Sequence, residues 1–352
     1  MKRLMVNLFI AVVVVAMVVG VAPGWNKAEA KKTYNFTFSW WGPPTHAEAK
    51  YFHKPLLAEI EKRTGGRVKV KYAGGGVLGK SKDHYYMIRD GVADMGTPVI
   101  TYTPGLFMLQ DVGALPFASK DPMNLYKAMV ELTKKGYFDI EKPYKKVKFL
   151  APGVTTHYGL LFRKHRPETV ADMAGLKCRT PGGYQSKIVA ALGMTPVSVA
   201  PPEVYTSLER GVIDIHMHHF AGFTAYKTAE IAKAILDLRH TAFAGVFLCM
   251  NLDSWNSLTP DLQKIIQEVA YDVPFTAAYV KGEAETRAYA AKHNLEIYKL
   301  SPAEMVKAKA RTKVVWEQFV ADAEAKGLPG KKMVADFVKI LRGMGEDPPY
   351  QP

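Results

Sequence analysis

Two stretches of this chain, "IRDGVADMG" at 88–96 and "LERGVIDIH" at 208–216, share a pattern that constrains the fold more than any other feature. Each contains the end of an expected helix, a basic residue, a glycine, a valine and an aspartate two positions after the valine. The glycine suits a helix C-terminus, where the backbone needs a positive φ, and the valine starts a buried strand. The repeated pattern indicates two lobes that are built alike.

The residues around each copy alternate between strand and helix patterns. The first series has expected strands at 34–40 and 67–72 and helices at 46–63 and 81–90; the second has strands at 174–180 and 195–199 and helices at 183–192 and 202–210. This rhythm predicts parallel strands in α/β lobes. Two such lobes leave a cleft between them, and ligand sites in open α/β sheets form at the carboxyl ends of strands.

The remaining chain is expected to add one strand near 244–250 and several helices. A helix opens at Thr259, with Pro260 at its first position, and Pro274 should kink it. A short strand at 296–300 precedes helices at about 302–325 and 330–343, the first of which begins at Ser301 with capping-box spacing to Glu304. The last residues read as a tail.

Residues 1–30 have the pattern of a secretory signal peptide. Lys2 and Arg3 precede an apolar run from Leu4 to Ala22, and the small-residue site 28–30 follows. An uncleaved membrane anchor is the alternative, because the apolar run is close to spanning length. Cleavage after Ala30 would leave a soluble periplasmic protein.

The formal net charge of +14 allows an anionic partner. Residues 1–30 hold three basic residues and one acidic residue, so cleavage would lower the charge to +12. The lysines are scattered along the chain, which argues against nucleic acid. Cys178 and Cys249 are the only cysteines; a disulfide is one interpretation, and two buried free thiols are the one that we favour.

Three histidines, His216, His218 and His219, follow the expected strand in the second copy of the pattern. On a continuing strand, His216 and His218 would share one face and His219 the other. Two imidazoles on one face could hold zinc, but no further ligand lies at a recognisable motif spacing. Metal binding, hydrogen bonding in a pocket and structural packing therefore stay open, and we favour the pocket.

Strand-end geometry marks several further candidates. Arg179 lies in an otherwise apolar strand, where a charge is costly to bury unless it is paired. Its partner is either a neighbouring carboxylate or the carboxylate or sulfonate of a ligand, which a guanidinium binds with two hydrogen bonds. Trp40 and Trp41 end the first strand, so one should pack in the core and the other face the cleft.

Catalytic and cofactor motifs are missing from the sequence. It has no nucleophile elbow, no Walker loop and no dinucleotide fingerprint, and the glycine-rich stretch 74–79 lacks the Lys-Ser/Thr pair of a phosphate loop. We therefore expect a turn at 74–79 and no cofactor, and any enzyme chemistry would rest on the three histidines alone.

Several segments together resemble the DctP-type solute-binding proteins of tripartite ATP-independent periplasmic (TRAP) transporters. They are "RTGGRVKVKYAGGGVLG" (63–79), "IRDGVADMG" (88–96), "LPF" (115–117), "DMAGLKCRTPGG" (172–183), "LGMTPVSVAPPEVYTSLERGVID" (192–214) and "LTPDLQKII" (258–266). No single segment is decisive, but their order and spacing cover nearly all of the mature chain.

The resemblance implies an α/β fold with two-lobed periplasmic-binding-protein architecture, a long helix spanning both lobes and a ligand cleft between them. The implied lobes are 31–155 plus 244–283 and 156–243 plus 284–352. It further implies a monomer, and capture of a small organic acid for delivery to TRAP membrane subunits. In the family, the arginine matching Arg179 binds the ligand carboxylate, and a site residue four positions after Asp214 corresponds to His218, which we expect to donate a hydrogen bond. We expect the ligand-binding residues to be Arg179, His218, Trp41, Tyr102, Tyr158, His216 and His219.

This chain departs from the family pattern at two positions. Ile215 stands where relatives have glycine, and His218 stands where they often have an amide. Some relatives also carry a second arginine on the preceding strand, which 158–161 lacks. One arginine favours a monocarboxylate or sulfonate over a dicarboxylate. The rival interpretations are a secreted metal-dependent enzyme using the three histidines and a periplasmic sensor of the same fold.

Overall fold

The first of two sheets has the strand order β2-β1-β3-β10-β4. The structure, a computed structural model, describes residues 32–103, 105–273 and 275–351, so the expected signal peptide lies outside the described residues. The strands are β1 (Tyr34–Ser39), β2 (Val68–Ala73), β3 (Met95–Gly96), β4 (Val147–Gly153) and β10 (Val246–Asn251). β1 pairs in parallel with β2 and β3, whereas β10 pairs antiparallel with β3 and β4.

The second sheet has the order β11-β9-β5-β8-β6-β7. Its strands are β5 (Tyr158–Phe162), β6 (Lys177–Thr180), β7 (Thr195–Ser198), β8 (Ile215–His219), β9 (Ala234–Leu236) and β11 (Glu296–Tyr298). β6 pairs in parallel with β7 and β8, but β5 pairs antiparallel with β8 and β9. The prediction of parallel pairing is thus confirmed for each strand–helix–strand series. It does not hold for β5 and β10, which pair antiparallel with their neighbours.

The antiparallel strands arise where the chain passes from one sheet to the other. β4 leads directly to β5, and β9 leads to β10, with no helix between them. The two connections run beside each other, because the Thr155 amide donates to the Phe243 carbonyl (2.9 Å) and the Tyr158 amide donates to the Thr241 carbonyl (2.7 Å).

The repeated sequence pattern has the same structural role in both sheets. Gly91 and Gly211 have φ values of 76° and 75°, as the helix-end prediction requires. The Asp94 carboxylate accepts from the amide of Thr37 in β1 (2.7 Å), and the Asp214 carboxylate accepts from the amide of Lys177 in β6 (2.9 Å). Each aspartate therefore ties its segment to the neighbouring strand.

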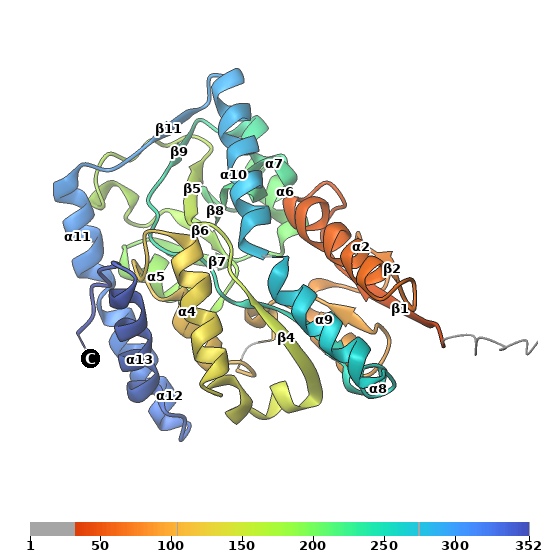
Figure 1. Cartoon of the computed structure of the whole chain (residues 1–352). Coiled ribbons are helices and arrows are strands. Elements are labelled where there is room, and N and C mark those ends of the chain that lie inside the picture. The colour runs from red at the N-terminus through yellow and green to blue at the C-terminus, as the bar shows by residue number, and fades with distance from the viewer. Residues whose placement is uncertain (1–31, 104, 274, 352) are drawn as a thin grey trace, which may run out of the picture. The chain divides into compact units, whose positions relative to one another are not determined.

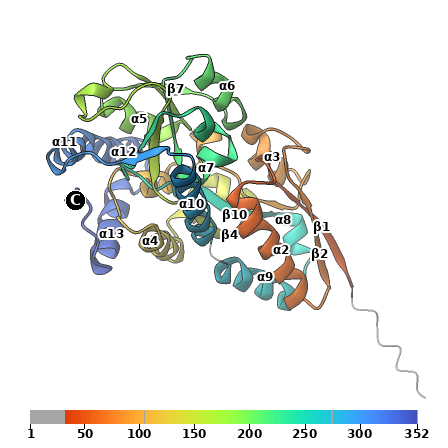
Figure 2. The same ribbon diagram turned by 90° about the horizontal axis from the view of Figure 1, so that it is seen from above.

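Helices cover both sheets (Figures 1 and 2). They are α2 (Lys54–Arg63), α3 (His84–Arg89), α4 (Pro122–Lys134), α5 (Gly183–Ala191), α6 (Val204–Glu209), α7 (Phe220–Ala225), α8 (Leu252–Asn256), α9 (Pro260–Asp272), α10 (Phe275–Lys292), α11 (Pro302–Thr312), α12 (Val314–Ala325) and α13 (Gly330–Gly343). In Figure 2, α4, α12 and α13 gather on one side and α2, α8 and α9 on the other.

The long helix predicted to span both lobes corresponds to α9 and α10, which follow each other end to end in Figure 1. α10 contacts α4 and the helical turn η1 (Ala49–His53) as well as α7 and β11, so it packs against elements associated with both sheets. The helix is interrupted between Asp272 and Phe275, where the sequence predicted a kink; Pro274 itself lies outside the described residues.

Two other expected helices differ in detail. The helix expected at 46–63 contains a π turn, η1, directly before α2. Pro55 has no amide hydrogen and its ring opposes the regular hydrogen-bond ladder, which accounts for the wider turn there. The helix expected at 302–325 is divided at Lys313 into α11 and α12. The tail also packs, since the Tyr350 ring stacks on Trp316 at 5.3 Å.

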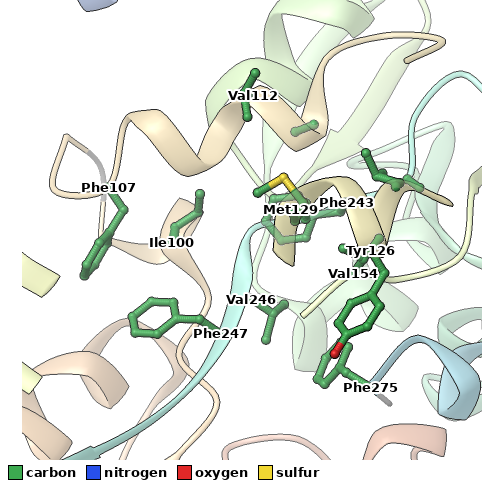
Figure 3. Packing of buried hydrophobic residues seen from close by; sticks show 14 of the residues in the cluster. Ile100, Phe107, Val112, Tyr126, Met129, Val154, Phe243, Val246, Phe247 and Phe275 are labelled. Carbon is green, nitrogen blue, oxygen red and sulfur yellow. The ribbon is translucent and has the colours of Figure 1, made fainter. Parts of the chain in front are cut away.

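Apolar side chains from both sheets and their helices form one large core cluster. Figure 3 shows Phe247, Val246 and Phe243 from β10 and the segment before it, with Met129 of α4 close to Phe243. Phe243 and Val246 are buried here and also line the cavity described next. Cys178 and Cys249 are both buried and unpaired, as we favoured from the sequence. None of the helices in the described residues has the length and apolar character needed to cross a membrane.

Candidate functional site

A narrow cavity of about 40 Å³ lies between the two sheets. Its wall combines the end of β1, the crossing segments, β8 and helical residues. The lining residues are Trp40, Trp41, His46, Glu48, Val99, Tyr102, Thr155, Tyr158, Pro181, His218, His219, Tyr226, Phe243, Val246 and Tyr279.

Aromatic rings make up most of this wall and hold one another in place. The Tyr158 and His218 rings stack at 5.7 Å with 4° between their planes, and Trp41 meets Tyr102 edge-on at 5.6 Å. The His219 ring lies 4.6 Å from Tyr279, also edge-on. Packed rings of this kind are rigid and leave flat apolar surfaces toward a ligand.

His218 is oriented by its own backbone neighbourhood. Burial lowers the pKa of His218 well below its ordinary value, and His216 and Arg179 lower it further, so the ring is neutral. Its Nδ1 lies 3.3 Å from the His219 carbonyl oxygen, which only accepts. Nδ1 therefore carries the proton, and Nε2 is left as an acceptor. This geometry differs from the donor role that we expected for His218.

The other two histidines of the cluster have different surroundings. His219 ends β8, where the chain turns into α7, and it lines the same cavity as His218 although the strand alternation placed them on opposite faces. His216 lies deeper: its Nδ1 pairs with Thr228 Oγ1 at 2.9 Å, and it is not part of the wall. Across the described residues, no group of three or more His, Cys, Asp or Glu is arranged to hold a metal ion.

Arg179 lies behind the wall and is completely buried. Its Nε donates to the Val199 carbonyl (3.0 Å) and its Nη1 to the Met217 carbonyl (3.4 Å). Nη2 has no partner within hydrogen-bond distance, although the guanidinium is near enough to the Tyr102 hydroxyl to lower the pKa of that group against the effect of burial. No carboxylate in the described part of the chain forms an ion pair with it, so the salt-bridge alternative has no support.

The positive charge of Arg179 acts on the cavity wall. Burial raises the pKa values of Tyr102, Tyr158 and Tyr226, and Arg179 offsets part of each shift. Burial also lowers the pKa of His219, which Arg179 lowers further. The guanidinium is therefore electrostatically coupled to several side chains that line the cavity.

Two polar residues of the wall, His46 and Glu48, were not predicted from the sequence. His46 and Glu48 stand at the start of the first long helix, next to the Gly42-Pro43-Pro44 turn. The Glu48 amide donates to His46 Nδ1 (3.2 Å), and burial lowers the pKa of His46 to about 4, so His46 is neutral with its proton on Nε2. The only sequence signal was their position directly after the strand-end tryptophans.

Five of the seven expected ligand-binding residues thus meet in one wall: Trp41, Tyr102, Tyr158, His218 and His219. Arg179 and His216 lie beneath it. Of the tryptophan pair, Trp40 is buried and Trp41 is partly exposed, and both contribute to the wall. Nothing in the sequence pointed to Tyr226, which directly follows α7, or to Tyr279 of α10.

Two sheets with a ring-lined cavity between them define a two-lobed binding protein that encloses a small ligand. Residues 38–322 match the family model DctP, described as bacterial extracellular solute-binding protein, family 7. The chain therefore belongs to this family, which consists of solute-binding proteins rather than enzymes.

Individual relatives agree with this assignment. The 2,3-diketo-L-gulonate-binding periplasmic protein of Escherichia coli is 27% identical over 232 residues, which cover 64% of this chain and 68% of that protein. A TRAP solute-binding protein from Rhodoferax ferrireducens, solved with benzoate, superposes with a TM-score of 0.80 at 24% identity, covering 89% of this chain and 99% of that one. One from Bordetella bronchiseptica, solved with mandelate, gives 0.81 at 24% identity over 88% and 99%. These two structures show the shared fold.

Proposed function

We propose that this protein captures a small organic monoanion in the cavity and delivers it to the membrane subunits of a TRAP transporter. The observation that carries the proposal is Arg179, a completely buried guanidinium with an unpartnered Nη2 and no ion pair among the described residues. A buried charge is costly without a counter-ion. A ligand carboxylate or sulfonate would supply both the missing charge and the missing acceptor.

The other charges of the wall favour a single negative group. Burial keeps His46, His218 and His219 neutral by lowering their pKa values. Glu48 is the remaining ionisable carboxylate of the wall, and its oxygens already contact His53, Thr97 and Tyr279. One unpaired cation therefore matches a ligand with one anionic group, as relatives of this fold solved with benzoate or mandelate illustrate.

The proposal includes the cellular setting. Extracytoplasmic solute-binding proteins reach their compartment through a signal peptide, and residues 1–30 have that pattern, with cleavage after Ala30. We propose that the mature protein is a monomeric periplasmic protein. N-terminal sequencing of protein secreted by a bacterial host should begin at Lys31, and retention of residues 1–30 would instead favour the membrane-anchor alternative.

A thermal-shift panel of small acids tests the ligand class. At 100 times its dissociation constant, a ligand stabilises the folded state by about 2.7 kcal/mol, which is readily measured. We expect monocarboxylates or sulfonates to raise the melting temperature and dicarboxylates to do so less. Exhaustive chelation should leave the shift unchanged. If chelation abolishes binding and zinc restores it, the metal-dependent alternative replaces this proposal.

We further propose that ligand binding closes two lobes, 31–155 plus 244–283 and 156–243 plus 284–352, about the crossing segments 153–158 and 242–247. All strands of each sheet fall within one of these ranges, and the two crossing segments are hydrogen-bonded to each other. Small-angle scattering should show a smaller radius of gyration at saturating ligand. An unchanged radius with proven saturation would contradict closure.

A further inference from the structure

Glu48 is the one acidic side chain in the wall of the cavity, and it is only 4% exposed. Its Oε1 accepts from Thr97 Oγ1 (2.7 Å) and lies 2.9 Å from His53 Nε2. Its Oε2 accepts from the Tyr279 hydroxyl. Contacts from three different elements thus fix the carboxylate rigidly at the edge of the empty space.

These contacts leave room for one more donor. A carboxylate offers about four acceptor positions, and the three neighbours of Glu48 occupy three of them. Burial raises the pKa of Glu48, but His53, with smaller contributions from His46 and Tyr279, outweighs burial and holds the pKa below its ordinary value. The group is therefore ionised, and an ionised carboxylate is a strong acceptor.

A second acceptor belongs to the same wall. The neutral His218 ring, with Nδ1 directed at the His219 carbonyl, has an Nε2 that only accepts. An anionic group of a ligand cannot satisfy either Glu48 or His218, since it brings no proton. Glu48 and His218 would therefore be satisfied by a hydrogen-bond donor on the ligand, whereas the Arg179 guanidinium would be satisfied by an anionic group.

Arg179 and Glu48 both act on the same side chains of the cavity wall. The pKa values of Tyr102 and Tyr226, raised mainly by burial, respond to both charges: Arg179 lowers them and Glu48 raises them. These two phenol rings are therefore within range of both charged groups. The wall itself consists mostly of flat rings such as Tyr158, His218 and Trp41.

Building on the proposed capture of an organic monoanion, we propose that the ligand is an aromatic monocarboxylate bearing a hydroxyl group, and that Glu48 accepts a hydrogen bond from that hydroxyl. The ring of the ligand packs among the rings of the wall, its carboxylate faces Arg179, and its hydroxyl faces Glu48. The same residue makes the site selective, because a second carboxylate on the ligand would meet Glu48 as a like charge.

Calorimetry with a matched set of acids tests this assignment: benzoate, its three monohydroxy derivatives, the corresponding methoxybenzoates and isophthalate. A hydrogen bond to a charged group corresponds to about 10- to 150-fold in affinity. We expect the best hydroxybenzoate to bind more tightly than benzoate by that factor. The matching methoxybenzoate, which has no proton to donate, should lose the gain, and isophthalate should bind worst.

Glu48→Gln keeps the shape of the side chain and removes its charge. We expect it to reduce the preference for hydroxybenzoate over benzoate by about fivefold or more and to improve isophthalate relative to benzoate. Glu304→Gln is the matched control, because Glu304 is similarly buried (7% exposed) and accepts from the Val170 amide outside the cavity. It should leave the preference unchanged. Ratios between ligands are compared within each variant, so a general loss of stability cancels.

The outcomes separate this inference from the proposed function. If benzoate and the hydroxybenzoates bind equally well, Glu48 does not bind a ligand hydroxyl and the inference is overturned. The same conclusion follows if Glu48→Gln keeps the full preference for hydroxybenzoate over benzoate. If none of the aromatic acids binds but an aliphatic monocarboxylate does, the aromatic class is wrong while organic-anion capture stands. If no organic acid binds at all, the proposed function fails with it.

Discussion

Replacing Arg179 with alanine is expected to weaken binding of the organic anion by about 30-fold to several thousand-fold, because truncating one partner of a buried charge pair costs about 2–5 kcal/mol. Arg179→Lys should fail as well. Lysine has no planar fork to form two parallel hydrogen bonds with a carboxylate. It also could not donate to the Val199 and Met217 carbonyls in the way that Arg179 does. Calorimetry on the wild type and both variants measures the effect.

Arg163→Ala is the matched control for this prediction. Arg163 follows β5 and donates to the carbonyls of Leu208 and Glu209, outside the cavity wall. The Arg163→Ala variant should therefore bind the organic anion with near-normal affinity. Melting curves without ligand complete the test: near-normal affinity in Arg179→Ala would remove the carboxylate-clamp model, whereas loss of folding in that variant would favour a structural role for Arg179.

Replacing His218 with alanine should weaken binding by about 5- to 150-fold, which corresponds to 1–3 kcal/mol for a lost hydrogen-bond partner in a buried site. The variant also loses the stacked contact with Tyr158. The expected ligand partner of Nε2 is a donor, so the loss should be larger for an acid with a hydroxyl than for one without. Calorimetry with such a pair of acids distinguishes this from simple loss of packing.

Gly222→Ala tests the same ring without removing it. A Cβ at position 222 would lie 2.2 Å from Nδ1 of His218 and 2.5 Å from its Cε1, so the ring would have to move. The His218 ring contacts Tyr158, Tyr226 and His219, so it has little room to move. Overpacking of this kind lowers the free energy of unfolding by about 1–3 kcal/mol. We expect reduced affinity in Gly222→Ala. Affinity should be unchanged in His293→Ala, because the exposed His293 ring lies on Tyr289 and is not part of the cavity wall. Unchanged affinity in both site variants would mean that His218 does not contact the ligand.

Most of the element types followed from local sequence patterns. The alternating residues at 34–40 and 67–72 predicted β1 and β2. The glycine in each of the two repeated stretches predicted where α3 and α6 end. Ser301 accepts from the Glu304 amide as its spacing predicted (3.3 Å). Such features depend on contacts within a few residues, so the sequence expresses them directly.

The predictions that missed depend on neighbours that local pattern does not contain. The antiparallel pairing of β5 and β10 depends on where the chain crosses between sheets. The sequence marked His218 as a candidate site residue but could not show which of its ring nitrogens carries the proton, which follows from the carbonyl beside Nδ1. His219 joined the same wall because β8 ends there and the chain turns into α7.

The sequence by itself determined the two similar lobes, the strand ends that supply the site, and the single arginine among apolar neighbours at 179, because periodicity, helix caps and residue chemistry are local properties. Only the tertiary structure decided that Arg179 has no carboxylate partner among the described residues, and that Glu48 meets Tyr279 across 231 positions of chain. Pairings at that separation depend on how the two sheets and α10 pack together. The burial that results also sets the charge of each histidine, and with it the chemistry that the cavity offers a ligand.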